Sequence, residues 1–337
     1  MMRDFLANVT PRSLFLLALL VAALVVAPLV IGGYPLSVLI LVLYFAYVGQ
    51  AWNVMMGFAG QLSLGHSLYV GLGAYAAATL FVRYGINPWL GAVVAMVVAA
   101  GFGAAIGYLA FRFGISGVYF ALLTIAFAEF TRVGFDHFGW VGGSGGLFLP
   151  VAQRTHNDVL NLRGSPAMFY YVVLALTVAA FLLCHYLMRR RIGYYWLAIR
   201  EDPQAAQALG INLFRAKLLA IMLSAAMTAV GGVVYAFYYN NLFPEQIFAT
   251  GRSIELILGP IIGGIGTLFG PLLGAFVLTV LAEGLRLLLD QFGQEIPGAT
   301  QFFYGICLLL VIVFLPNGIW PSLHRWLGLA GTREHGG

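Results

Sequence analysis

The sequence predicts an all-α protein, a polytopic integral membrane helical bundle with about ten membrane segments, two of them short or broken. Of the 337 residues, 61% are apolar and only 9% are charged, whereas soluble domains carry about 25% charged residues. The mean hydropathy is +0.93, and apolar stretches long enough to cross a bilayer recur along the chain. No basic stripe with interleaved aromatic residues occurs. We therefore expect membrane lipid, and no nucleic acid, to surround the chain.

Six candidate spans precede the one long polar interruption: residues 13–31, 35–56, 62–81, 88–111, 115–135 and 167–188. The first follows a short polar stretch and so resembles a secretory signal peptide. Its apolar run of about 18 residues is longer than the apolar part of a typical signal, and a second run follows at once. We therefore expect an uncleaved first span. Six crossings put the N-terminus and the polar interruption on the same side.

The remaining apolar stretches complete the topology. Residues 213–239 lead outward. Residues 254–289 are too long for one crossing and contain the sequence GGIGTLFGP, so we expect two short arms, 255–265 and 270–289, that return the chain to the outside. Residues 301–315 then bring the C-terminus inside. Eleven of the 17 arginine and lysine residues fall inside in this arrangement, as the positive-inside rule requires. We expect one transmembrane domain, 1–337, with both termini cytoplasmic.

The polar interruption at residues 189–217 is the most informative segment of the chain. It holds six of the 17 basic residues and only two acids, Glu201 and Asp202. Basic flanks of membrane spans resist translocation, so this loop should lie in the cytoplasm. A solvated linker between two spans would satisfy these observations equally well.

A short helix is readable inside this loop. Asp202 can cap its N-terminus, Pro203 suits the first helical position, and Gly210 can end it. Three residues would then form a small apolar ridge on one face: Ala205, Ala206 and Leu209. Such a ridge favours docking into a groove of another protein.

Two glycine-rich segments coincide with polar side chains, at residues 53–75 and 259–275. Broken helices at membrane depth persist only where they are packed in protein or line a water-filled cavity. We therefore expect part of a translocation path here, formed by six residues: Asn53, Gln61, Ser63, His66, Gly266 and Thr267. Gln61, Ser63 and His66 could equally satisfy the start of a helix. A metal site is not expected, because no second ligand residue stands at suitable spacing from His66.

The remaining polar groups suggest no catalytic centre. Glu129 and Arg132, three residues apart, most simply form an ion pair on one helix face, although a proton relay through Glu129 would indicate a secondary transporter. Glu255 begins an arm and suits a helix N-terminus. Residues 140–147 predict a flexible outer loop. No Walker motif and no nucleophile elbow occur, so the chain should neither bind ATP in that way nor act as an enzyme.

Five collinear blocks carry a family resemblance: GFAGQLSLGHSLYVGLGAYAAA, GVYFALLTIAFAE, AIREDPQAAQALGINLFRAKLLAIMLSA, SIELILGPIIGGIGTLFGPLLGA and LLLVIVFLPNGI. Together they resemble the LivM-type permease of bacterial high-affinity branched-chain amino acid ABC importers. The outer glycine loop departs from the family pattern T-G-G-[SA]-[DN]-G-L, because Val141 and Gly145 stand at its first and fifth places.

The resemblance implies a bacterial inner-membrane subunit that pairs with a second, related permease. It also implies two cytoplasmic ATPase subunits that hold ATP and Mg, a periplasmic substrate-binding protein, and no cofactor on this chain. A permease of the same type for urea or short amides, a proton-coupled carrier and a channel remain alternatives. The coupling segment implied by the family comprises Arg200, Glu201, Asp202, Ala205, Ala206, Leu209 and Gly210.

Overall fold

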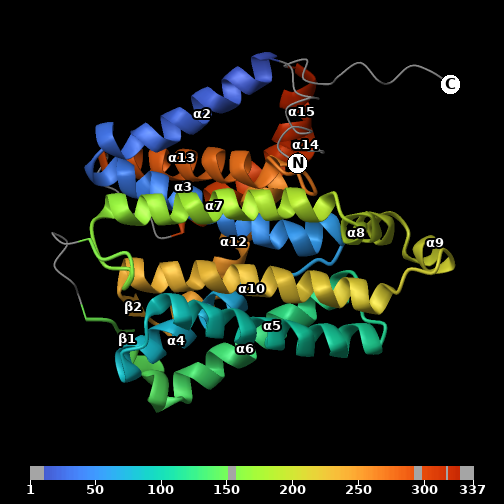
Figure 1. The fold of residues 1–337 in the computed structure, drawn as a ribbon, viewed down its shortest axis with the longest axis horizontal. Helices are drawn as coiled ribbons and strands as arrows, with labels where there is room; N and C mark the ends of the chain where they lie inside the picture. Colours follow the sequence, from blue (N-terminus) through green and yellow to red (C-terminus); the bar gives the residue numbers. More distant parts are fainter. Residues whose placement is uncertain (1–10, 151–156, 292–297, 316–317, 327–337) are drawn as a thin grey trace.

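The computed structural model describes residues 11–150, 157–291, 298–315 and 318–326, and most of them are helical. Figure 1 shows most of the long helices running beside one another along the long axis of the molecule, with α8 (Arg191–Glu201) and α9 (Pro203–Ala208) at one end and β1 (Leu147–Phe148) and β2 (Asn241–Leu242) at the other. Within the described ranges, six helices are long and apolar enough to span a membrane: Gly33–Phe58, Pro88–Arg112, Val118–His137, Pro166–Met188, Leu213–Tyr239 and Gly270–Leu289. The chain is thus a multi-pass membrane protein.

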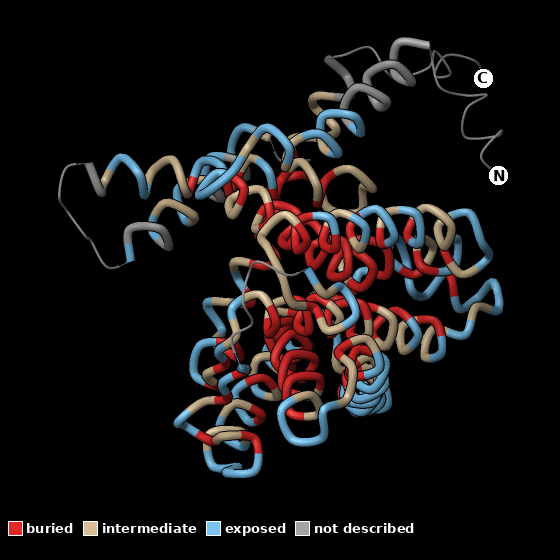
Figure 2. The backbone as a smooth tube through the Cα atoms, turned by 60° about the vertical axis from the view of Figure 1, so that its left-hand side comes forward, coloured by how far each residue is buried: buried red, intermediate tan, exposed pale blue. Residues whose placement is uncertain are grey.

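The surface of the peripheral helices supports this conclusion. Leu90 and Val97 of α5 (Pro88–Arg112) are 63% and 68% exposed, and Phe130 of α6 (Val118–His137) is 75% exposed. Figure 2 shows buried residues along the middle of the bundle and long exposed stretches at its periphery. Apolar surface of this extent is expected to face lipid rather than water.

The N-terminal half follows the predicted spans closely, with one exception. α2 (Pro11–Val30) precedes α3 (Gly33–Asn53), which continues into a π-helical turn, η1 (Val54–Phe58). The predicted start of the third span at residue 62 is wrong, since α4 covers Ser67–Tyr84. Residues 59–66 are not helical, and Gly60 has φ +68°, which interrupts a right-handed helix.

The next three helices have recognisable ends. α5 (Pro88–Arg112) is capped by the Asn87 side chain, which accepts from the backbone N–H of Trp89 at 2.8 Å. α6 covers Val118–His137. α7 (Pro166–Met188) starts at Ser165, whose hydroxyl accepts from the Met168 N–H. These ends lie within three residues of the predicted spans.

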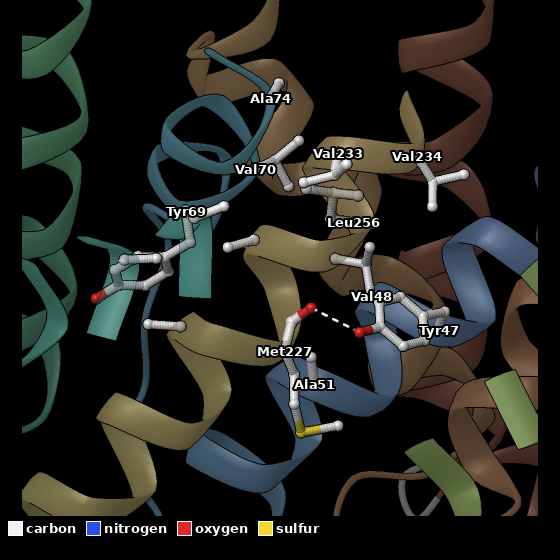
Figure 3. Packing of buried hydrophobic residues seen from close by; sticks show 14 of the residues in the cluster. Tyr47, Val48, Ala51, Tyr69, Val70, Ala74, Met227, Val233, Val234 and Leu256 are labelled. Atoms are coloured by element: carbon white, nitrogen blue, oxygen red, sulfur yellow. Dashed lines mark hydrogen bonds between the residues drawn. The ribbon is translucent and has the colours of Figure 1, made fainter. Parts of the chain in front are cut away.

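Glycines let the core helices approach closely. α10 (Leu213–Tyr239) packs on α4 and α5. A Cβ atom at Gly232 of α10 would lie 2.0 Å from the Val70 carbonyl oxygen, and one at Gly73 of α4 would lie 2.1 Å from the Ala229 carbonyl oxygen. Figure 3 shows the neighbouring apolar packing and the Tyr47 hydroxyl, which donates to the Met227 carbonyl at 2.8 Å. Glycine is therefore required at this contact.

The stretch 254–289 divides into two helices, as predicted. α12 (Thr250–Gly263) and α13 (Gly270–Gln291) form an antiparallel hairpin, and the intervening turn contains Gly266 with φ +78°. Glu255 lies in the second turn of α12 and does not begin it. The hairpin is followed by α14 (Ala299–Phe314) and α15 (Ile319–Trp326).

The end opposite α9 carries short regular elements in the predicted outer loop. Two 3₁₀ turns, η2 (Gly139–Val141) and η3 (Gly143–Gly145), lead into β1 (Leu147–Phe148). β1 pairs antiparallel with β2 (Asn241–Leu242), Leu147 opposite Leu242. β2 precedes the short α11 (Pro244–Ile247). The glycine loop is therefore held to the segment after α10 by backbone pairing.

Candidate functional site

The polar interruption contains the predicted short helix, α9 (Pro203–Ala208). The Asp202 carboxylate accepts from the backbone N–H groups of Gln204 at 2.8 Å and Ala205 at 3.1 Å. Gly210 has φ +83°, a conformation that favours glycine just after a helix. The predicted cap, first position and stop are confirmed.

The predicted apolar ridge on α9 is wrong in one residue. Ala206 is only 1% exposed and packs into the core of the bundle, whereas Leu209 is 80% exposed. Ala205 and Gly210 are exposed as well. Ala205 and Leu209 are four residues apart and share one side of the helix, while Ala206 is rotated by about 100° from Ala205. We call Ala205, Leu209 and Gly210 the α9 outer face.

A second helix in the loop, α8 (Arg191–Glu201), was not predicted. Ile192, Trp196 and Ile199 stand at helical spacing and could have indicated it. Trp196 is fully buried and donates through Nε1 to the Ala216 carbonyl at 2.8 Å. α8 thereby attaches α9 to the start of α10.

Arg200, near the end of α8, contacts the membrane part of the chain. Its Nη1 donates to the Gly57 carbonyl oxygen at 2.5 Å. A Cβ atom at Gly266 would lie 2.1 Å from the same nitrogen. Arg200 therefore connects the loop to both glycine-rich segments, while Glu201 and Asp202 remain exposed.

Asn53 joins the two glycine-rich segments directly. Its Nδ2 donates to the Thr267 carbonyl at 2.9 Å, and its Oδ1 accepts from the Gly266 N–H at 2.8 Å. The Thr267 hydroxyl accepts from the Gly270 N–H at 3.0 Å, at the start of α13. The structure thus brings three of the predicted path residues together, although they are about 210 residues apart in sequence.

The other three predicted path residues are also buried and bonded within the chain. His66 Nε2 pairs with the Ser224 hydroxyl at 3.0 Å and His66 Nδ1 with the Ser63 hydroxyl at 3.3 Å. Gln61 Nε2 donates to the Ala59 carbonyl at 2.9 Å. These bonds join the segment before α4 to η1 and α10, while His66 at the N-cap of α4 makes no side-chain capping bond, so the alternative that the three side chains satisfy the start of α4 is not borne out. Among the described residues, no cluster suited to hold a metal ion is found.

A polar cavity of about 420 Å³ lies at the opposite end of the bundle from α9. Arg132 on its wall bonds Glu129 at 2.6 Å and Asp136 at 2.8 Å, so the predicted ion pair is confirmed and extended. Glu129 is 51% exposed. The remaining wall residues come from α6, η3, β2–α11 and their connections: His137, Ser144, Phe243, Pro244, Glu245 and Gln246.

A second charged pair lies on α12, where the sequence predicted a role for Glu255 at a helix start but not its pairing with Arg252. Arg252 Nη1 donates to Glu255 Oε2 at 3.0 Å, and the Arg252 guanidinium lies 4.9 Å from the centre of the Tyr235 ring. An arginine and a glutamate three residues apart inside an apolar stretch were the available signal. On α13, Glu283 accepts a hydrogen bond from the Tyr34 hydroxyl.

The comparison with known protein families decides what kind of protein carries these features. Residues 34–314 match the family described as "Branched-chain amino acid transport system / permease component". The chain belongs to this permease family. Its members are transporter components rather than enzymes, in agreement with the absence of a predicted catalytic motif.

Individual relatives support the assignment. The permease is 28% identical over 346 residues to the high-affinity branched-chain amino acid transport system permease protein LivM of Escherichia coli, covering 96% of this chain and 79% of the relative. It is 26% identical over 292 residues to LivH of the same organism, covering 82% and 90%. The fructose import permease FrcC of Rhizobium meliloti is 29% identical over 45% of the chain and 42% of the relative. No solved structure matches significantly.

Proposed function

We propose that this permease is one membrane subunit of an ATP-binding-cassette importer for branched-chain amino acids in a bacterial inner membrane. The observation that carries the proposal is α9, a capped helix whose outer face is free in this chain at one end of the bundle (Figure 1). A short helix presenting Leu209 at 80% exposure suits a groove on a cytoplasmic ATPase.

The partners follow from the relatives and from what this chain lacks. Because the permease resembles both LivM and LivH, two related subunits of one system, we propose a second permease beside it. ATP and Mg would bind to two cytoplasmic ATPases, because no Walker motif occurs in the sequence. A periplasmic binding protein would deliver the solute, and this chain would bind no cofactor.

The orientation is proposed from the charge distribution. With ten membrane segments and both termini cytoplasmic, the loop 189–217 lies inside with six of the 17 basic residues. β1, β2 and the polar cavity at Arg132 then lie on the periplasmic side, where the binding protein would dock. The domain 1–337 acts as one unit, with the loop as its cytoplasmic coupling element.

ATP binding would be coupled to transport by contacts that differ between two conformational states of the complex. Closure of the two ATPases around ATP would move α9, and the Arg200 bond to Gly57 would carry that movement to both glycine-rich segments. Asn53, Gln61, Ser63, His66, Gly266 and Thr267 would shift with them and alter access to the path. The two states must differ in docking free energy, because coupling is a differential binding free energy.

Reconstitution with the neighbouring subunits tests this function. The permease, its partner permease, the two ATPases and the binding protein are placed in liposomes, and uptake of radiolabelled leucine is measured. We expect uptake that requires ATP hydrolysis and is insensitive to a proton ionophore. Uptake without ATPases, or loss of uptake with the ionophore alone, would contradict the proposal. Urea and a short amide serve as competing substrates because they are the alternatives predicted from the sequence. Fructose is added because the relative FrcC is named a fructose import permease.

A further inference from the structure

Two oppositely charged side chains, Arg252 and Glu255, lie on the first two turns of α12, between the middle of the bundle and its β1–β2 end. Ser253, next to Arg252, accepts from the Ser67 N–H at 2.9 Å. His66, next to Ser67, bonds Ser224 close to the midpoint of α10. α4 and α12 therefore both begin about halfway along α10, while the Arg252 guanidinium extends toward the β1–β2 end as far as Tyr235, four residues before the end of α10.

Aromatic rings surround the pair on one side. The Tyr235 ring lies beneath the Arg252 guanidinium and is 4.5 Å from Tyr239 and 6.0 Å from Tyr44, measured between ring centres. Tyr44 stands near the middle of α3, which separates it from the tyrosines that commonly mark a membrane interface.

The Tyr44 hydroxyl is a polar group without a bond. The residue is 5% exposed, and its oxygen has no hydrogen-bond partner among the residues that the structure describes. It borders a cavity of about 20 Å³, room for about one water molecule. The other lining residues are aromatic or aliphatic: Ile40, Leu41, Val173, Val234, Tyr235, Tyr238 and Tyr239. An unbonded buried hydroxyl costs about 1–3 kcal/mol, so a partner that binds there is favoured.

Stability does not account for the ion pair. Charged residues at membrane depth face protein or a water-filled cavity and are commonly functional, and a buried pair is seldom more stable than apolar residues of similar size. The Arg252 and Glu255 side chains retain 19% and 22% of their exposure in this chain. Both side chains thus keep part of their surface exposed in this chain.

We propose that Arg252 and Glu255, with Tyr44 and Tyr235, form a binding site for a zwitterionic α-amino acid in transit. Arg252 would donate to the substrate carboxylate, and Glu255 would accept from its ammonium group. The aliphatic side chain would lie on the tyrosine rings. This inference rests on the proposed function and names where on this chain the substrate is held.

The pair suits transport because it is satisfied with or without substrate. In the empty site the two charges bond each other. In the loaded site each bonds the opposite charge of the zwitterion, so the net charge stays constant. Binding is then weak, which allows release as well as entry. Cation–π contact with Tyr235 keeps Arg252 in place during the exchange.

The complete importer in liposomes tests the site with radiolabelled leucine. Arg252→Gln and Glu255→Gln are each expected to lower leucine uptake at least tenfold, and to raise the leucine Kd of the detergent-purified complex without binding protein at least tenfold. Arg286→Gln on α13 is the matched control, because it removes one exposed arginine outside the proposed site. Uptake and affinity of this control should equal wild type.

The charge-swapped variant Arg252→Glu/Glu255→Arg separates binding from a structural role. It keeps an ion pair on α12, so uptake recovers if the pair only stabilises the helix, and that recovery overturns the inference. If the pair instead binds substrate, the charge-swapped variant remains inactive. The substrate carboxylate then faces an acidic side chain, and the substrate ammonium group faces a basic one. Undiminished uptake by Arg252→Gln likewise overturns this inference alone. Failure of wild type to import leucine with ATP overturns the proposed function and the inference together.

Discussion

Adjacent alanines on α9 should respond in opposite ways to the same substitution. Ala205 is exposed, whereas Ala206 is 1% exposed and packed in the core. Ala206→Glu places an unpaired carboxylate inside the fold, which costs about 3–5 kcal/mol, a large share of the about 5–15 kcal/mol that stabilises a typical domain. Ala205→Glu leaves the carboxylate in water in the isolated chain, so its cost there is within about 0.5 kcal/mol.

The cost of Ala205→Glu should arise only on docking. If the α9 outer face enters an apolar groove, the same carboxylate loses its water there, and a penalty of about 3 kcal/mol lowers ATPase affinity roughly a hundredfold. We expect Ala205→Glu permease with wild-type yield and melting temperature, and with ATPases that no longer co-purify. Ala206→Glu should reduce yield and melting temperature.

The assay combines thermal melting of the purified permease with titration of labelled ATPase subunits. Wild-type ATPase affinity in Ala205→Glu would refute the assignment of the α9 outer face as a docking surface. An unchanged melting temperature in Ala206→Glu would refute the burial argument. The ridge predicted from the sequence places both alanines in the groove and therefore predicts the same outcome for both variants. Comparing the two variants thus also distinguishes that ridge from the α9 outer face.

Three further perturbations follow from the contacts. Gly232→Ala should lower the free energy of unfolding by about 1–3 kcal/mol, because its Cβ would meet the Val70 carbonyl at 2.0 Å. The control Gly101→Ala has open space around its Cβ and should raise stability slightly in the same melting experiment. Asn53→Leu leaves the Gly266 N–H unbonded and should lower the free energy of unfolding by about 1–3 kcal/mol. Leucine uptake should also be lost. Uptake at the wild-type rate would contradict the role of Asn53 in joining the two glycine-rich segments. Glu129→Gln should leave uptake unchanged, since the carboxylate is 51% exposed in a surface pair; a proton-coupled carrier would lose uptake.

The sequence was sufficient for the features that depend on local physics. Apolar length predicted most of the long helices, and capping residues predicted both ends of α9 within one residue. The division of residues 254–289 was predictable because glycine and proline interrupt an apolar run that is too long for one crossing. These are properties of short segments, which a single chain displays directly.

Features that depend on tertiary contacts were not predictable in this way. Ala206 differs from Ala205 only in which side of α9 meets α10, and helical spacing alone does not state this. α4 begins at Ser67 and not at the predicted residue 62, because the segment before it bonds residues from other helices, such as Ser224. The pairing of Glu255, which the sequence predicts only as a helix-start residue, with Arg252 and the tyrosines was not predictable, because those tyrosines come from α3 and α10.

The α12–α13 hairpin has a consequence for biogenesis. α12 has 14 residues, about 21 Å of helix, and carries two charges, so the translocon should not accept it as an independent span. α13 is 22 residues long and is long enough to integrate. Co-translational insertion must therefore admit the two as a unit once α13 has left the ribosome. A ribosome stalled between them should hold a nascent chain whose α12 is still accessible to a water-soluble labelling reagent.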